Sequence, residues 1–348
     1  MSEKQKTLKE AITVSGVGLH TGQEVTLTFR PAPENHGFKF RRIDLPGQPV
    51  IDADADYVVD TSRGTSIEHN GTKVSTIEHV LAALTGMDLD NVLIDIDCTE
   101  TPILDGSSRY YVEAIQKSGI VEQNAERQYF KITEILRFSD PEKNIELLIL
   151  PDDTYKVSVM IDYDTKVLGT QNAHLSHISE FADEIGNCRT FVFLHELEYL
   201  IQNNLIKGGD LSNAIVFVNR LIAQDELDRL AKFFNKPRVE VLKEGILNNL
   251  ELHFANEPAR HKLLDVIGDL SLVGMSIKGH VIASRPGHNA NTNFARIIKH
   301  HIKNELSQPA IPHYDLKKPP LYDINDIRRI LPHRPPFLLV DKILNMSD

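Results

Sequence analysis

Residues 260–269, with the sequence RHKLLDVIGD, constrain the fold of this chain more than any other stretch. Pro258 suits the first turn of a helix, where its missing N–H costs nothing. Wound as a helix, the stretch places its apolar side chains on one side: Leu263, Leu264, Ile267 and Leu270. His261, Asp265 and Asp269 are four residues apart and line up on another side. An imidazole and a carboxylate one turn apart can bind one divalent metal, and a second carboxylate can orient a neighbouring imidazole. The plainer alternative is a solvated polar face with a His–Asp pair.

The composition narrows the class of protein. The 348 residues allow two or three domains, and their net charge of −11 argues against nucleic-acid binding, which needs clustered Lys and Arg. Cys98 and Cys188 are too few for a disulfide framework or a thiolate-rich zinc site, so a metal would depend on His and carboxylate ligands. The charged N-terminus and the lack of an apolar run of about 20 residues predict a cytoplasmic protein without a transmembrane segment.

A second helix is expected at residues 75–86, where an apolar stripe with helical spacing ends at Gly86. His79 points nearly opposite this stripe and is flanked by alanines, which leaves room for another part of the chain to approach. Ser75 and Glu78 also fit a capping box, in which Glu78 would serve only the helix N-terminus. Both interpretations of Glu78 stay open at this point.

The remaining patterns predict strands and helices in alternating groups. Strands are expected at 12–14, 25–29, 38–40, 58–59, 91–97, 145–150, 155–161, 214–218 and 277–283, and further helices at 109–118, 179–186, 195–203 and 289–304. Because each half has a helix with an early histidine followed by a strand, we expect an α+β fold of two related units packed face to face, 1–125 and 126–306. Residues 222–250 are charged and mixed, and we expect them to be an extra excursion of the second unit. The active site is expected at the domain junction.

The histidines and carboxylates can be combined into one hydrolytic site. Two His and one Asp, here His79, His261 and Asp265, would leave a fourth zinc position open for water. A zinc ion in such a site lowers the pKa of water toward about 7 and polarises a carbonyl. Glu78, beside a ligand, could take the proton of that water, and His288, after a glycine in a strand-to-helix turn, could protonate a leaving amine.

Further polar residues support this interpretation or leave a choice open. Asp269 could keep the imidazole of His288 protonated, and Thr190 could donate a hydrogen bond to an oxyanion. Arg260 fits either a phosphate contact or an ordinary ion pair, and His20, at the turn of the first hairpin, fits either a surface position or one that overhangs a site. An open metal position beside a base and an acid favours catalysis over a binding module that uses its metal for structure only.

Six short stretches together resemble a known family. They are 16–22 (GVGLHTG), 75–79 (STIEH), 102–107 (PILDGS), 189–191 (RTF), 260–270 (RHKLLDVIGDL) and 287–288 (GH). In this order, over residues 8 to about 304, the chain resembles the UDP-3-O-acyl-N-acetylglucosamine deacetylases, the zinc amidases of lipid A synthesis. The implied reaction is zinc-dependent hydrolysis of the N-acetyl group of UDP-3-O-(3-hydroxyacyl)-N-acetylglucosamine, with release of acetate.

The resemblance also implies roles for single residues. The zinc ligands would be His79, His261 and Asp265. Glu78 would be the base and His288 the acid. Thr190 would donate to the oxyanion, and Asp269 would be the partner of His288. Lys262 would lie near the diphosphate and Phe191 near the substrate. The family fold implies two packed βααβ-type domains, each with an insert. The second insert, here about 191–215, would shape an apolar passage for the acyl chain.

The last part of the chain resembles a different family. Residues 307–321 are proline-rich and read as a linker. The motif at 331–337, LPHRPPF, resembles the start of a 3-hydroxyacyl-[acyl-carrier-protein] dehydratase, with His333 as its catalytic histidine and Pro335 where an aromatic residue is usual. The family's acidic residue would follow on a later helix. Residues 322–348 are therefore expected to be the start of a dehydratase domain, inactive here, one strand and a helix turn long. Dehydration, with an acyl carrier protein as partner, is the alternative function and belongs to a full-length fusion.

Overall fold

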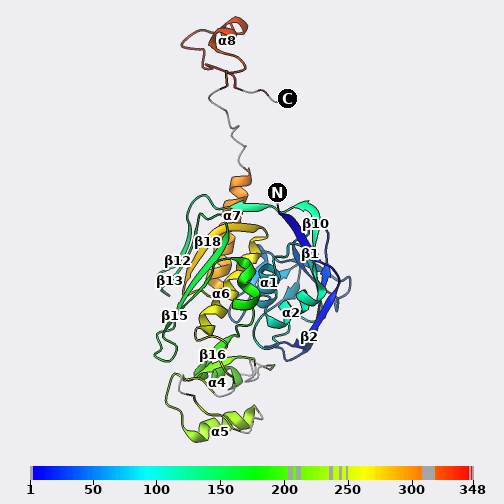
Figure 1. Ribbon diagram of the computed structural model, residues 1–348, viewed down its shortest axis with the longest axis vertical. Coiled ribbons are helices and arrows are strands. Elements are labelled where there is room, and N and C mark those ends of the chain that lie inside the picture. Colours follow the sequence, from blue (N-terminus) through cyan, green and yellow to red (C-terminus); the bar gives the residue numbers. More distant parts are fainter. Residues whose placement is uncertain are drawn as a thin grey trace. The chain divides into compact units, whose positions relative to one another are not determined.

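The computed structural model describes residues 3–202, 207–208, 213–234, 238–242, 245–247, 250–307, 318–344 and 346 (Figure 1). The chain divides into a large compact unit, Met1–Ile302, and a small unit, Lys303–Asp348, and each is described by itself. The expected α+β class is confirmed, because the large unit combines mixed sheets with helices. The four expected segments, 1–125, 126–306, 307–321 and 322–348, stay predictions. Parts of the expected insert, excursion and linker lie outside the described residues.

The first sheet is built entirely from the N-terminal part of the chain. Its strand order is β2 (Ile12–Val17), β3 (Glu24–Pro31), β9 (Val92–Ile96), β4 (Phe38–Arg42) and β5 (Val50–Asp52), and only β4 and β9 run parallel. The expected hairpin is β2–β3. Alternate side chains of the central strands point inward and are buried: Val25, Leu27, Phe29, Phe40, Val92, Ile94 and Ile96.

The second sheet takes all its strands from residues 129–284. Its order is β12 (Leu136–Asp140), β13 (Ile145–Leu150), β18 (Ser276–Ser284), β14 (Tyr155–Asp162) and β15 (Thr170–Leu175), with β11 (Tyr129–Lys131) parallel to β18. Its buried face has the same alternation: Leu147, Ile149, Val157, Val159, Ile161, Val281 and Ala283. β15 and β12 are strands that the sequence did not predict.

The helices α1 (Glu78–Gly86) and α6 (Glu257–Leu270) pack against each other in the interior, with α2 (Arg109–Ser118) on the side of β2 and α6 against β14 and β15 (Figure 1). A Cβ atom on Gly268 would lie only 2.1 Å from the backbone oxygen of Glu78. A glycine in α6 therefore permits the close approach of the two helices. The helix predicted around 260–269 is confirmed, with Pro258 in its first turn. Its polar side is buried as well, so the alternative of a solvated polar face is wrong.

Smaller elements complete the large unit. β1 (Lys4–Leu8) pairs with β10 (Ile120–Glu126), and β6 (Val58–Asp60), β7 (Ser66–His69) and β8 (Thr72–Val74) form a three-stranded sheet. β16 (Phe191–Phe193) runs parallel to β17 (Ile215–Phe217). The helix α4 (Leu194–Gln202) follows β16, and α5 (Gln224–Phe233) follows β17. The helix expected at 179–186 is shorter: a single 3₁₀ turn at Ile178–Glu180 leads into α3 (Phe181–Glu184). α7 (His288–Ser307) begins one residue before its predicted start.

In the small unit, α8 (Ile324–Ile330) begins with a capping box in which Asp323 and Asp326 satisfy each other's backbone N–H groups. A single antiparallel bridge joins Tyr322 and Ile343. The strand expected within residues 322–348 is not formed among the described residues, because they offer it no neighbouring strand to pair with. In neither unit do the described residues contain a helix that is long and apolar enough to cross a membrane.

Candidate active site

Three predicted metal ligands meet where α1 packs on α6. His79 lies in the first turn of α1, whereas His261 and Asp265 lie one turn apart on α6. Asp265 Oδ1 is 3.4 Å from His261 Nε2 and 3.8 Å from His79 Nε2, and one ligand atom from each of the three residues lies within 4.8 Å of the others. The two imidazole rings are nearly perpendicular, with centroids 5.0 Å apart. All three residues are buried.

The donor atoms of this cluster are prepared for a cation. His261 Nδ1 donates to the backbone oxygen of Cys188 at 3.0 Å, which leaves the Nε2 lone pair facing the cluster. Burial, aided by the charge of His261, lowers the pKa of His79 to about 3, so this imidazole is neutral, as a metal ligand must be. Asp265 Oδ1 is buried and has no hydrogen-bond partner among the described residues. A buried acceptor without a donor is costly, and a metal ion would satisfy it.

Glu78 precedes His79 and lies in the same first turn of α1. Its Oε2 accepts a hydrogen bond from the backbone N–H of Thr65 at 2.9 Å. The N-cap residue of α1 is Ile77, whose side chain makes no capping bond, so the capping-box interpretation of Glu78 is wrong. Burial raises the pKa of Glu78 to about 7, with the charges of Asp269 and Asp265 adding to the rise. A carboxyl group with such a pKa can both take and release a proton near neutral pH.

His288 begins α7 and donates from Nδ1 to Asp269 Oδ2 at 2.9 Å. Burial works to lower the pKa of His288, but the charges of Asp269 and Asp265 and the hydrogen bond to Asp269 raise it to about 9. The imidazole is therefore protonated at neutral pH. The pKa of Glu78 and that of His288 are displaced toward values that suit a base and an acid in one site.

Phe191 and Lys262 lie beside the cluster. Thr190 is held by a backbone hydrogen bond. Lys262 Nζ donates to Asp265 Oδ2 at 2.8 Å and lies 5.8 Å from the ring centroid of Phe191. Thr190 N donates to Gly106 O at 2.8 Å, and Thr190 follows two residues after Cys188, the backbone partner of His261. Arg260, in contrast, pairs with Glu184 at 2.6 Å and makes an ordinary ion pair.

Comparisons with known proteins identify the family of this chain. The model of a protein family described as UDP-3-O-acyl N-acetylglycosamine deacetylase matches residues 5–234 and 235–300. The chain belongs to this deacetylase family. The resemblance inferred from the six motifs is thereby confirmed.

Individual relatives are similar over nearly the whole chain. A protein of Bacteroides thetaiotaomicron named bifunctional enzyme LpxC/FabZ is 48% identical over 344 residues, which cover 99% of this chain and 74% of that protein. The bifunctional enzyme LpxC/FabZ of Porphyromonas gingivalis is 49% identical over 345 residues, with the same coverage of 99% and 74%. A UDP-3-O-acyl-N-acetylglucosamine deacetylase of Idiomarina loihiensis is 40% identical over 301 residues, covering 85% of this chain and 89% of that protein.

Several polar contacts in this deacetylase-family site were not predicted from the sequence. Thr65 contacts both Glu78 and Asp269, and Asn291 donates to Asp269 Oδ2 at 2.8 Å. His20 is not a loose surface residue, because its Nδ1 is 2.6 Å from the buried carboxylate of Glu100. Burial opposes ionisation of Glu100, but hydrogen bonds from His20 and Thr21 lower the pKa of Glu100 to about 2.

Two hollows lie near Glu78 and His288. One, of about 180 Å³, is lined by His20, Ser62 and Gly64, and a Cβ atom on Gly64 would lie 2.9 Å from Glu78 Oε1. The other, of about 250 Å³, is lined by Ser62, His288 and Lys143. Because Ser62 lines both hollows, they lie next to each other.

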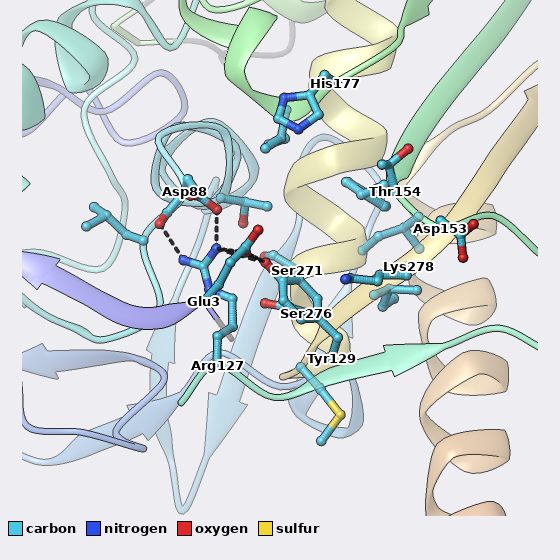
Figure 2. Close-up of a pocket in the computed structure, with 17 residues that line it drawn as sticks. Glu3, Asp88, Arg127, Tyr129, Asp153, Thr154, His177, Ser271, Ser276 and Lys278 are labelled. Carbon is cyan, nitrogen blue, oxygen red and sulfur yellow. Dashed lines mark hydrogen bonds and ion pairs between the residues drawn. The ribbon is translucent and has the colours of Figure 1, made fainter. Parts of the chain in front are cut away.

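A further pocket of about 180 Å³ lies at the opposite ends of α1 and α6, next to Ser271 (Figure 2). None of the three clustered ligands lines it. Its charged groups are largely used within the protein, since Arg127 pairs with Asp88 and Glu3 as Figure 2 shows. The chemistry of the side chains therefore favours the cluster of His79, His261 and Asp265, and not this pocket, as the active site.

Proposed function

We propose that this chain hydrolyses the N-acetyl group of UDP-3-O-(3-hydroxyacyl)-N-acetylglucosamine and releases acetate, as a zinc-dependent deacetylase of lipid A synthesis. The observation that carries the proposal is the buried cluster of His79, His261 and Asp265, in which Asp265 Oδ1 lacks a partner among the described residues. Membership of the deacetylase family and the names of the relatives support the substrate.

The ligand set favours zinc. Two imidazoles and one carboxylate match the three-ligand zinc sites of hydrolases, which keep one position open. When bound there, zinc would supply Lewis acidity to the carbonyl of the amide and make an attacking water more acidic. His79 and His261 would bind through Nε2, because the Nδ1 of His261 is held by Cys188 O and the Nε2 atoms of both rings face Asp265.

The protons are divided between two residues. Glu78 accepts the proton of the water whose oxygen attacks the acetyl carbonyl carbon, and its pKa near 7 suits that task. His288, held protonated by Asp269, donates its proton to the amide nitrogen as the C–N bond breaks. The products are acetate and a free amine. Thr190 is proposed to donate to the carbonyl oxygen while it carries negative charge.

The remaining site residues are proposed to bind the substrate. The ammonium of Lys262 has three donors, of which Asp265 accepts one, so others are available for a diphosphate. Phe191 belongs to a cluster of aromatic rings with centroids 5.5–6.4 Å apart, which also contains Tyr163, Phe193 and Phe217. Phe191 and Phe193 lie on β16 and Phe217 on β17, at the ends of the expected insert, whereas Tyr163 directly follows β14. We propose that this cluster forms the apolar passage for the acyl chain.

The experiment measures zinc content and acetate release from a UDP-3-O-acyl-N-acetylglucosamine, with and without a chelator. Alanine variants of His79, His261 and Asp265 should each lose zinc affinity, whereas Glu78→Ala should keep zinc and lose rate. Glu113→Ala, which removes an exposed ion pair on α2, is the control that should keep both. Full zinc occupancy in Asp265→Ala would contradict the proposed ligand set.

The second candidate function concerns the C-terminal unit. Three relatives are named bifunctional, and the motif around His333 resembles a dehydratase, so we propose that residues 322–348 begin a dehydratase domain. His333 is exposed, and we propose that it is inactive in this 348-residue chain. An acyl carrier protein as partner of a longer fusion stays a prediction.

A further inference from the structure

Thr65 contacts both groups that the proposed reaction uses to move protons. It is fully buried in the connection between β6 and β7. Its backbone N–H donates to Glu78 Oε2 at 2.9 Å, and its Oγ1 lies 2.5 Å from Asp269 Oδ1. Asp269 in turn holds His288. One residue from the N-terminal half of the chain therefore connects the base on α1 with the partner of the acid on α6.

We propose that Thr65 is a positioning residue that fixes Glu78 and the Asp269–His288 pair relative to each other. This inference rests on the proposed deacetylase function and deepens it. Asp269 is completely buried, and an ionised carboxylate has only acceptors, so its orientation depends on the donors around it. His288 and Asn291 both donate to Oδ2, which leaves Oδ1 to the hydroxyl of Thr65.

The backbone around Thr65 is shaped for these two contacts. Gly64 has a φ of +147°, a conformation that side chains rarely adopt, and a Cβ atom there would lie 2.9 Å from Glu78 Oε1. A glycine therefore lets the N–H of Thr65 approach the carboxylate. Thr65 itself is β-branched and stiff about χ1, so its hydroxyl stays aimed at Asp269 once the backbone is set. The two hydrogen bonds belong to one rigid unit.

The decisive variant is Thr65→Val, which keeps the shape of the side chain and the N–H to Glu78 but removes the hydroxyl. Asp269 Oδ1 then loses its donor, and the carboxylate and its imidazole gain freedom to rotate. Loss of a hydrogen-bond partner that orients a site residue without touching the substrate typically costs about 10- to 100-fold in activity. We expect kcat to fall by this factor while KM and zinc content stay unchanged, and Thr65→Ser to restore most of kcat.

Thr7→Val is the matched control, because Thr7 is also a buried threonine whose Oγ1 donates at 2.6 Å, in its case to Asn91 O. It should lower Tm without changing kcat. If Thr65→Val does not fold, Thr65→Ala removes the same hydroxyl without adding bulk and is compared with Thr65→Ser in the same way.

The outcomes separate this inference from the proposed function. Wild-type protein that releases no acetate from the UDP-sugar would remove the proposed function itself. Active wild-type protein with an equally active Thr65→Val variant would overturn the role of Thr65 alone. A Thr65→Ser variant as slow as Thr65→Val would also overturn it, because the methyl group and not the hydroxyl would then matter.

Discussion

Asp269→Asn is expected to move the alkaline limb of the kcat/KM profile to lower pH. In the wild type, burial works to lower the pKa of His288, yet the charges of Asp269 and Asp265 and the hydrogen bond to Asp269 raise it from 6.5 to about 9. This rise corresponds to about 3 kcal/mol in favour of the imidazolium. An acid acts only while protonated, so activity falls as pH rises through its pKa.

The substitution removes charge and keeps shape. In the wild type, His288 Nδ1 lies 2.9 Å from Asp269 Oδ2. The amide oxygen of an asparagine can still accept this hydrogen bond, but it carries no net charge. Because the charge of Asp265 remains, only part of the rise should be lost. We expect the alkaline limb to move down by roughly one to two pH units. Each limb belongs to the coupled site, since Glu78 titrates there as well, so the difference between variant and wild type is the quantity to measure.

The assay is acetate release at subsaturating substrate across the neutral and alkaline range, with zinc content measured in parallel. Asp95→Asn is the matched control, because Asp95 is also buried and paired, in its case with Arg41 in the first sheet. Its stability should fall while its pH profile stays that of the wild type. An active Asp269→Asn variant with an unchanged alkaline limb would refute the argument. Either His288 would then not be the acid, or Asp269 would not be the cause of its raised pKa.

Three further outcomes are expected. In metal-free protein, burial raises the pKa of Glu78 from 4.5 to about 7, so the folded state binds this proton more tightly and loses stability as pH rises through this window. Glu78→Gln should remove up to about 3 kcal/mol of that loss, seen as a smaller drop in Tm between about pH 5 and pH 8; an unchanged drop would contradict the pKa. Zinc at 1,000 times its Kd should stabilise the wild type by about 4 kcal/mol, and a comparable rise in Tm in Asp265→Ala would place the metal elsewhere. The 348-residue chain should not dehydrate a 3-hydroxyacyl carrier, because His333 is exposed; product detected by mass spectrometry would show otherwise.

The sequence predicted those parts of the site that follow from regular periodicity. The four-residue spacing of His261, Asp265 and Asp269 needed only a helix, and α6 provides it. The position of His79 opposite the apolar stripe of its own helix predicted a partner, and α6 is that partner. The helix expected at 109–118 agrees with α2 to the residue. Long stretches with strong patterns are the part of a fold that local reasoning reaches.

The residues that were missed have partners far away in the chain. Thr65 and Asp269 are 204 residues apart, and no local pattern relates a threonine in a loop to a carboxylate on a distant helix. β15, with the sequence TQNAHL, has too few apolar residues to read as a strand, and its pairing with β14 defines it instead. The capping box failed for a similar reason. The backbone of Ser75 pairs with residues 99–101, and the carboxylate of Glu78 is held by Thr65.

Gly268 shows how the scaffold and the site depend on one another. In isolation a glycine in a helix costs about 1 kcal/mol relative to alanine, so local propensity alone counts against it in the last turn of α6. In the fold it lies against the backbone oxygen of Glu78, where a Cβ atom has no room. That contact sets how closely α1 approaches α6, and the approach brings His79 within reach of Asp265. The same crossing places Glu78 near the carboxylates of Asp265 and Asp269, whose charges add to the rise of its pKa. A locally unfavourable residue thus fixes both the spacing of the proposed metal ligands and the electrostatics of the proposed base.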